Sequence, residues 1–190
     1  KYWRNAGAQA GDVLILTKPI GSGVIFNANL KDWVSDAALQ ECVQTIITLN
    51  KVAAEVLANY EVHAATDITG FGLAGHGLEM AQSSDVALEI NTAEVPFMSE
   101  ALAMYEKGVS TGVNAANRAL IEDHLHFSVD LPAWHQEIFV DPQTSGGLLV
   151  AVPAAQGEAA LGALHAAGVE AARLIGMARP LEGGKHLVFG

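Results

Sequence analysis

Short apolar segments with the composition of β-strands alternate along this chain with segments that have the spacing of α-helices. A β-rich apolar run covers 12–17, and residues 86–91 alternate apolar and polar side chains as a half-buried strand does. The helical pattern is strongest over 36–60, where apolar residues recur at spacings of three, four or seven. This alternation predicts an α/β (α+β) layer, in which helices cover a small mixed β-sheet.

The remaining elements follow from the same patterns. Ser35 or Asp36 can cap the helix over 36–60, and Thr69 is a plausible N-cap for a helix over 70–82. Further strands are expected at 62–66, 148–152, 169–178 and 186–189, and further helices at 99–107, 115–124, 131–139 and 154–167. A chain of 190 residues fits a single domain over 1–190.

Composition narrows the classes of function. The chain has 10 Lys and Arg against 21 Asp and Glu, a formal net charge of −11, so we expect no nucleic-acid partner. No apolar run is long enough to cross a bilayer, and we expect no membrane partner. The single cysteine favours a reducing cytoplasm. The chain opens at Lys1 rather than Met, so we expect it to be a piece of a longer protein.

Asp67 stands where chemistry best explains the local sequence. A short small-residue strand ends on this one acid, and the turn Thr69-Gly70-Phe71-Gly72 then leads into a helical pattern. A carboxylate at a strand end suits a hard cation such as Mg²⁺, while glycines and a helix N-terminus allow a phosphate to approach the backbone. Spacing alone leaves the alternative that Asp67 merely helps to cap the following helix.

Two other glycine-containing turns could bind anions. Gly21-Ser22-Gly23 follows a predicted strand but lacks the complete phosphate-loop and dinucleotide fingerprints, which favours a plain strand-to-loop transition. The turn 144–147, Thr-Ser-Gly-Gly, can form a nest of N–H groups or simply lead into a buried strand. The residues leave both alternatives open for this second turn.

Five further side chains have ordinary explanations. His63 and His76 flank Asp67 without the spacing of a helical metal-binding pair, so we expect structural or surface roles. His124 and His126 alternate around Leu125 and are expected to face solvent. Cys42 lacks electropositive neighbours in sequence and is expected to be a small core residue.

Three segments, taken together and in this order, resemble the C-terminal half of the selenophosphate synthetases (selenide, water dikinases), which belong to the aminoimidazole ribonucleotide synthetase superfamily. The resemblance covers nearly the whole chain. It implies a C-terminal domain whose N-terminal ATP-binding half is absent here. The segments are Leu16-Thr17-Lys18-Pro19-Ile20-Gly21-Ser22-Gly23-Val24, Ala65-Thr66-Asp67-Ile68-Thr69-Gly70-Phe71-Gly72-Leu73 and Asp141-Pro142-Gln143-Thr144-Ser145-Gly146-Gly147-Leu148-Leu149.

The resemblance implies conversion of ATP, selenide and water to selenophosphate, orthophosphate and AMP, with Mg²⁺ as cofactor. Asp67 matches the family's C-terminal metal ligand, and Thr66, Thr69, Gly70 and Gly72 would lie near phosphate. The family's catalytic Cys or selenocysteine and its catalytic Lys lie upstream, so the resemblance implies no catalytic residue in this chain and inactivity of the chain alone. The implied partners are ATP, selenide, the protein's own N-terminal domain and a second copy in a homodimer.

Two differences from the family's pattern limit which residue roles are carried over to this chain. Cys42 and Lys18 do not match its catalytic positions. The family's loop glycines before an Asn-Arg pair are only partly present here, where Ser110-Thr111-Gly112 precedes Asn117-Arg118. The alternatives are a domain of another ATP-dependent enzyme of the superfamily, or a binding module without catalysis.

Overall fold

Seven strands form one mixed sheet in the order β2-β5-β1-β6-β3-β7-β4 in the computed structural model, which describes residues 2–190. The pairs β2–β5, β5–β1, β1–β6 and β6–β3 are antiparallel, and the pairs β3–β7 and β7–β4 are parallel. The predicted mixed sheet is therefore confirmed. Its strands are β1 (Asp12–Leu16), β2 (Ala64–Asp67), β3 (Val86–Ile90), β4 (Leu125–Phe127), β5 (Leu148–Pro153), β6 (Arg173–Pro180) and β7 (Leu187–Phe189).

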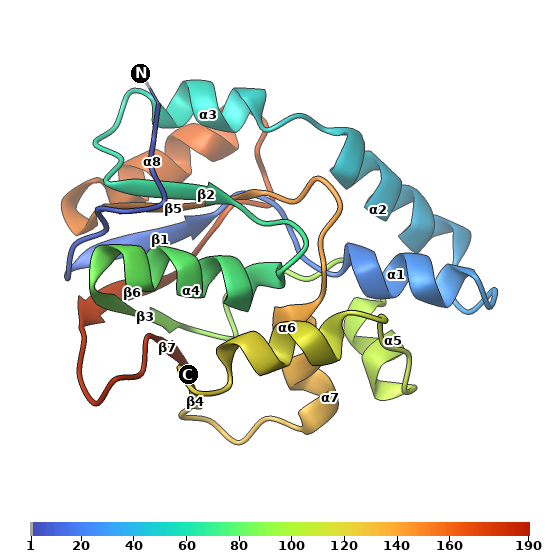
Figure 1. Ribbon diagram of the computed structural model, residues 1–190. Helices are drawn as coiled ribbons and strands as arrows, with labels where there is room; N and C mark the ends of the chain where they lie inside the picture. The colour runs from blue at the N-terminus through green and yellow to red at the C-terminus, as the bar shows by residue number, and fades with distance from the viewer. Residues whose placement is uncertain (1) are drawn as a thin grey trace.

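Helices cover both faces of the sheet (Figure 1). The helices α3 and α8 lie on one face, and α4 lies on the other. Shorter helices extend the α4 side. The helices are α1 (Ser22–Asn29), α2 (Asp36–Ile47), α3 (Lys51–Leu57), α4 (Gly72–Ser84), α5 (Ala101–Glu106), α6 (Asn114–Ile121), α7 (Ala133–Gln136), α8 (Ala154–Ala166) and the 3₁₀ helix η1 (Glu137–Val140).

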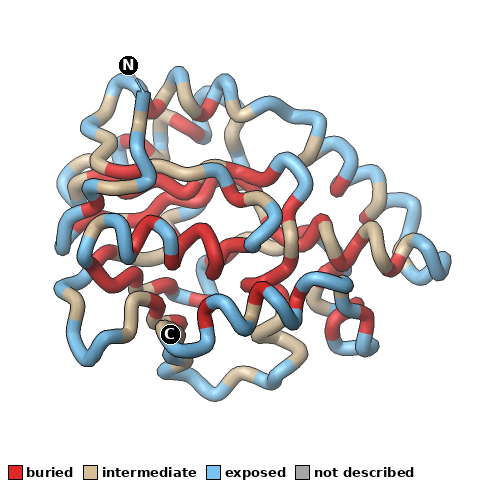
Figure 2. The backbone as a smooth tube through the Cα atoms, viewed as in Figure 1, coloured by how far each residue is buried: buried red, intermediate tan, exposed pale blue. Residues whose placement is uncertain are grey.

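Strand β1 shows how sequence alternation builds two cores. Successive side chains of a strand point to opposite faces of a sheet. Leu14 and Leu16 belong to the cluster packed under α4, whereas Ile15 between them belongs to the cluster under α3 and α8. All three are fully buried because both faces are covered. Figure 2 shows this buried centre, with the exposed residues on the outer helices and loops.

The helix predicted over 36–60 is wrong in extent, because the structure divides it into α2 and α3. Ser35 caps α2 as expected, accepting a hydrogen bond from the Ala38 N–H at 3.2 Å. The chain leaves the helix at Thr48, whose backbone is extended. The Thr48 carbonyl accepts a hydrogen bond from Lys18 Nζ, and the Asn50 amide donates to the Gly146 carbonyl. Partners distant in sequence therefore stabilise the break, and no local pattern encodes them.

Two elements are missing from the sequence prediction. The helix α1 begins directly after Gly21, whose φ is 128°, and its Ser-Gly start has low intrinsic helix propensity. The strand β4 has only three residues and pairs in parallel with β7 near the C-terminal end. The predicted helix over 131–139 is instead α7 followed by η1. No helix within residues 2–190 combines the length and apolar character needed to cross a membrane.

Candidate functional site

Asp67 is the last residue of β2, an edge strand of the sheet, and its side chain is exposed. Among the described residues its carboxylate has no hydrogen-bond or ion-pair partner within contact distance. Helix α4 begins at Gly72 and has no side-chain cap. The alternative that Asp67 caps this helix is therefore wrong. An exposed acid without a protein partner is free to meet a ligand.

The turn after Asp67 is held from several sides. The N–H of Ile68 donates to the Gly147 carbonyl at 2.8 Å, and the Thr69 carbonyl accepts from the Gln143 N–H at 2.9 Å. The Asn117 amide donates to the Gly70 carbonyl at 2.8 Å and to the Val140 carbonyl at 2.9 Å. Three distant segments thus fix the turn, and Asp67 stands at the start of a preformed loop.

The two glycines of this turn have different roles. Gly72 has a φ of +70°, and a Cβ there would lie 2.8–2.9 Å from backbone atoms of residues 139–141. Its N–H donates to the Thr69 carbonyl at 3.0 Å. Gly70 is exposed, and a Cβ there would meet nothing within 4 Å. Gly72 therefore shapes the turn, whereas Gly70 leaves open space above it.

Thr69 is bound to His76 rather than to the start of the helix, so its predicted role as an N-cap is wrong. Thr69 Oγ1 lies 3.0 Å from His76 Nε2, and His76 Nδ1 lies 3.0 Å from Glu79 Oε2. A carboxylate only accepts, so Nδ1 carries a proton, and in the tautomer protonated at Nδ1 alone Nε2 accepts from the Thr69 hydroxyl. The Phe71 ring lies 5.4 Å from the His76 ring and covers it. His76 is structural, as expected, and leaves the lone pairs of Thr69 Oγ1 available.

His63 also has a structural partner. Its Nδ1 lies 2.9 Å from both carboxylate oxygens of Asp12, which joins the start of β1 to the residue preceding β2. Burial alone would lower the pKa of His63, but the hydrogen bond and charge of Asp12, assisted by Glu61, raise it. His124 and His186 contact each other through Nδ1 at 3.3 Å, and His126 is exposed. His63 and His76 are thus bound to Asp12 and Glu79, and no group of three or more His, Cys, Asp or Glu side chains forms a metal-type cluster among the described residues.

The Gly21-Ser22-Gly23 turn binds the segment Asp141–Gln143 of the same chain. The N–H groups of Gly21 and Ser22 donate to Gln143 Oε1 at 2.9 and 3.1 Å, and the Gly23 N–H donates to Asp141 Oδ2 at 3.0 Å. Donors that are already occupied cannot form a phosphate cradle. The plain interpretation of this turn is confirmed, although it leads into helix α1.

The turn 144–147 packs tightly between the ends of β1 and β2. A Cβ on Gly146 would lie 2.1 Å from the Ile68 carbonyl oxygen, and one on Gly147 would lie 2.6 Å from the Lys18 N atom. The carbonyls of Ser145 and Gly146 accept from Lys18 Nζ and from the Asn50 amide. This packing favours the structural alternative, in which the turn leads into β5 and supports the residues next to Asp67.

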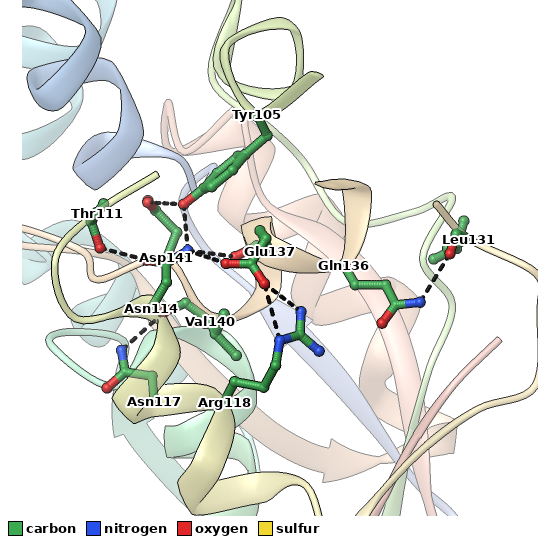
Figure 3. Close-up of polar contacts among 10 residues, drawn as sticks. All are labelled: Tyr105, Thr111, Asn114, Asn117, Arg118, Leu131, Gln136, Glu137, Val140 and Asp141. Carbon is green, nitrogen blue, oxygen red and sulfur yellow. Dashed lines mark hydrogen bonds and ion pairs between the residues drawn. The ribbon is translucent and has the colours of Figure 1, made fainter. Parts of the chain in front are cut away.

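A polar network joins α5 and α6 to the segment 137–141, and the sequence interpretation missed it (Figure 3). Tyr105 donates to Asp141 Oδ1 at 2.5 Å, and the Asn114 amide donates to the Tyr105 oxygen and to Glu137. Arg118 forms an ion pair with Glu137 at 2.8 Å. Burial raises the pKa of Asp141 to about 6, against the hydrogen bonds from Tyr105, Gln143 and Gly23. The only sequence signal was the polar residues within otherwise apolar helical segments.

The buried Cys42 confirms its assignment to the core. Its side chain is fully buried, and burial, with the charges of Asp141 and Glu41, raises the pKa of its thiol to about 11. A thiol of this kind is protonated at neutral pH and is a poor nucleophile. Lys18 is also buried and binds two carbonyl oxygens of the chain.

The donor set around Asp67 fits Mg²⁺ only in part. Within residues 2–190, no three His, Cys, Asp or Glu side chains converge as metal ligands. Mg²⁺ is commonly held by one or two carboxylates with phosphate oxygens and water. A single free carboxylate at a rigid, exposed turn is therefore compatible with one part of such a site, completed by ligands from elsewhere.

Comparison with known proteins identifies the family to which this chain belongs. The family described as AIR synthase related protein, C-terminal domain, matches residues 9–186. The chain is 40% identical over 175 residues to a selenide, water dikinase of Rhizobium meliloti (strain 1021) and 42% identical over 178 residues to one of Myxococcus xanthus (strain DK1622). These matches cover 92% and 93% of the chain but 50% of each relative, so the chain spans about half their length.

A solved structure supports the fold. The hydrogenase maturation protein HypE in complex with ATP superposes with a TM-score of 0.62 at 19% identity, covering 97% of this chain and 49% of that chain. At this identity the similarity concerns the fold alone. The expected aminoimidazole ribonucleotide synthetase type of C-terminal domain is confirmed by the family match and by this superposition.

Proposed function

Because the chain belongs to the family of AIR synthase related proteins, C-terminal domain, we propose that it is the C-terminal half of a selenophosphate synthetase. The whole enzyme would convert ATP, selenide and water to selenophosphate, orthophosphate and AMP. The observation that carries this proposal is the identity of about 40% to selenide, water dikinases over nearly the whole chain. The catalytic residues would belong to an N-terminal half, and this chain alone would not turn over ATP.

Asp67 is the residue that we assign to Mg²⁺. Its exposed carboxylate, without a protein partner among residues 2–190, supports the assignment. When bound, the ion would neutralise charge on the phosphate oxygens of ATP. Hydrogen bonds with Gly147, Gln143 and Asn117 fix the turn that begins at Ile68. This turn would hold the Asp67 carboxylate in place for the ion.

Thr66, Thr69 and Gly70 are the residues that we place near phosphate. Thr66 lies next to Asp67 on the edge strand, and Gly70 leaves open space above the turn. When the Thr69 hydroxyl donates to His76 Nε2, its oxygen would accept from a bound water or another donor rather than donate to phosphate. Gly72 contributes by shaping the turn, since its N–H is already bound.

The partners of the domain follow from the same proposal. The N-terminal half would supply the remaining ligands, bind ATP and selenide, and pair with a second copy in a homodimer. A cytoplasmic location fits a chain with one buried cysteine. With a net charge of −11, a chain that handles a polyphosphate would need metal ions or a partner surface to offset the repulsion.

The test uses the complete protein that contains this chain. Selenide-dependent formation of AMP and selenophosphate is measured by ³¹P NMR. The variant Asp67→Asn should lower kcat about 100-fold or more, because transition-state charge stabilisation by a metal is worth several kcal/mol. Its circular dichroism and thermal unfolding should match those of the unmodified protein.

The matched control is Asp130→Asn, which removes an equally exposed acid outside the helices and strands. It should retain full activity. Wild-type activity in Asp67→Asn would contradict the metal assignment alone. An unmodified protein that forms no AMP with selenide would instead contradict the proposed reaction.

A second candidate is another ATP-dependent enzyme of the superfamily. The superposition with HypE supports it at the level of the fold. Phosphorylation of another substrate, together with a lack of selenide dependence, would favour this candidate over a selenophosphate synthetase. A non-catalytic binding module would show neither activity.

A further inference from the structure

Lys18 is a buried cation that lacks an anionic partner within residues 2–190. Lys18 follows β1 in the chain and is only 7% exposed. Its Nζ donates to the carbonyl oxygens of Thr48 at 2.6 Å and Ser145 at 2.9 Å. Among the described residues no carboxylate lies within ion-pair distance of it. Burial lowers its pKa, and no neighbouring charge opposes this effect.

An ammonium in this position remains incompletely satisfied. Lys Nζ has three donors, and two of them are bound to the carbonyls of Thr48 and Ser145. Carbonyl dipoles offset part of the cost of burial, but a buried charge is normally paired with an opposite charge. The third donor therefore has no acceptor among residues 2–190, and an anion from outside the chain would supply both the acceptor and the counter-charge.

A cavity of about 470 Å³ adjoins this lysine. Lys18 lines it together with the end of α2, the start of α3 and the turn between α8 and β6. This volume lies within the range of about 300–1,000 Å³ found for small-molecule sites. The lining also includes the apolar residues Val52, Ala53 and Val169 and the exposed Leu49.

The charges around the cavity limit the kind of anion. Glu41 and Glu170 also line it, so a ligand with two negative charges would meet repulsion that a single ammonium cannot offset. Gln44 also lines the cavity and carries a neutral amide donor. Because two carboxylates line the cavity against one ammonium, an anionic group is favoured only in direct contact with Lys18, and the apolar residues of the lining suit an apolar body.

We propose that this cavity binds a small amphipathic monoanion, with a carboxylate or similar group at Lys18 and an apolar chain along Val52, Ala53 and Val169. The site is separate from Asp67 and does not depend on the reaction proposed above. Fatty monocarboxylates of medium length have the required combination of one charge and one apolar chain.

The binding test uses the complete protein that contains this chain, with 8-anilinonaphthalene-1-sulfonate as the fluorescent probe. N-phenyl-1-naphthylamine, the same ring system without the charged group, is the neutral comparison. One site should bind the sulfonate, and octanoate should displace it, whereas octanol should displace it far less well. The variant Lys18→Met should weaken sulfonate binding at least tenfold and change the neutral probe's affinity less than twofold.

A second variant keeps the test decisive if Lys18→Met fails to fold. Ala171→Phe fills the cavity without removing the ammonium, and it should weaken both probes. Lys107→Met, at an exposed lysine outside this cavity, should change neither affinity. Sulfonate binding that survives Ala171→Phe would overturn the proposal, as would equal displacement by octanoate and octanol.

Discussion

At the scale of single residues, buried polar groups stabilise the segments that contact the turn after Asp67. Asp141 is fully buried and receives hydrogen bonds from Tyr105, Gln143 and Gly23. Its position links η1 to the start of α1. Removing one partner of a buried charge costs more than a surface hydrogen bond is worth, because the remaining group stays desolvated. Such residues should therefore matter more for stability than the exposed Asp67.

The prediction at this scale concerns Tyr105→Phe. The change removes the hydroxyl that donates to Asp141 and accepts from Asn114, which leaves both with one partner fewer. We expect a loss of about 2 kcal/mol in the free energy of unfolding, measured by urea denaturation. Tyr60→Phe is the control, since its hydroxyl bonds the Ala159 carbonyl in an exposed position. A loss as large in Tyr60→Phe would contradict the role of burial.

At the scale of elements, the unit that positions Asp67 consists of β2, the turn 68–71 and helix α4. This unit is local in sequence, but its geometry depends on contacts with η1 and α6. The start of α4 packs against the backbone of residues 139–141, and Asn117 of α6 binds the Gly70 carbonyl. The turn therefore keeps its shape only when these elements are in place.

The prediction for this element compares two glycines two residues apart. Gly72→Ala places a Cβ 2.8–2.9 Å from the backbone of residues 139–141 at a φ of +70°. It should lower the free energy of unfolding by about 2 kcal/mol or more, because neither the backbone contact nor the positive φ can be relieved without moving the main chain. Gly70→Ala meets open space and should change stability by about 0.5 kcal/mol or less. Thermal unfolding of both variants measures the difference, and equal effects would refute it.

At the scale of the whole molecule, pH acts on stability through the link between β1 and β2. The pKa of His63 is raised in the folded chain by Asp12. The protonated form is thus favoured by folding. Its contribution is fully present below the unfolded pKa of about 6.5 and is lost as pH rises through the higher folded value.

The corresponding prediction uses His63→Gln. The variant should lose about 1 kcal/mol of stability relative to the unmodified chain at pH 5.5, and less at pH 9. Denaturant titrations at both pH values measure the difference. His126→Gln, at an exposed histidine, should show no such dependence. A deficit for His63→Gln that grows with pH would reverse the sign and contradict the assigned linkage.

Local sequence patterns predicted most of the fold because the spacing of apolar residues reflects which side chains are buried in the core. Strands such as β1 and β5 are short apolar runs, and α8 is bounded by Pro153 and Gly168. Failures occurred where tertiary contacts override local preference. The break between α2 and α3 is held by Lys18 and Asn50, which bind carbonyls distant in sequence. Thr69 was expected to cap α4 and instead binds His76.

The sequence by itself determined the alternation of strands and helices, the position of Asp67 at a strand end, and the three segments that resemble selenophosphate synthetases. Periodicity and residue type are local quantities, so one chain suffices to read them. Only the tertiary structure decided that the glycine turns near residues 21 and 145 bind their own chain and that Asp67 has no cap role. It alone also showed that Lys18 is buried with no carboxylate of residues 2–190 beside it. Burial, and the partners available to a buried group, depend on segments that meet only after folding.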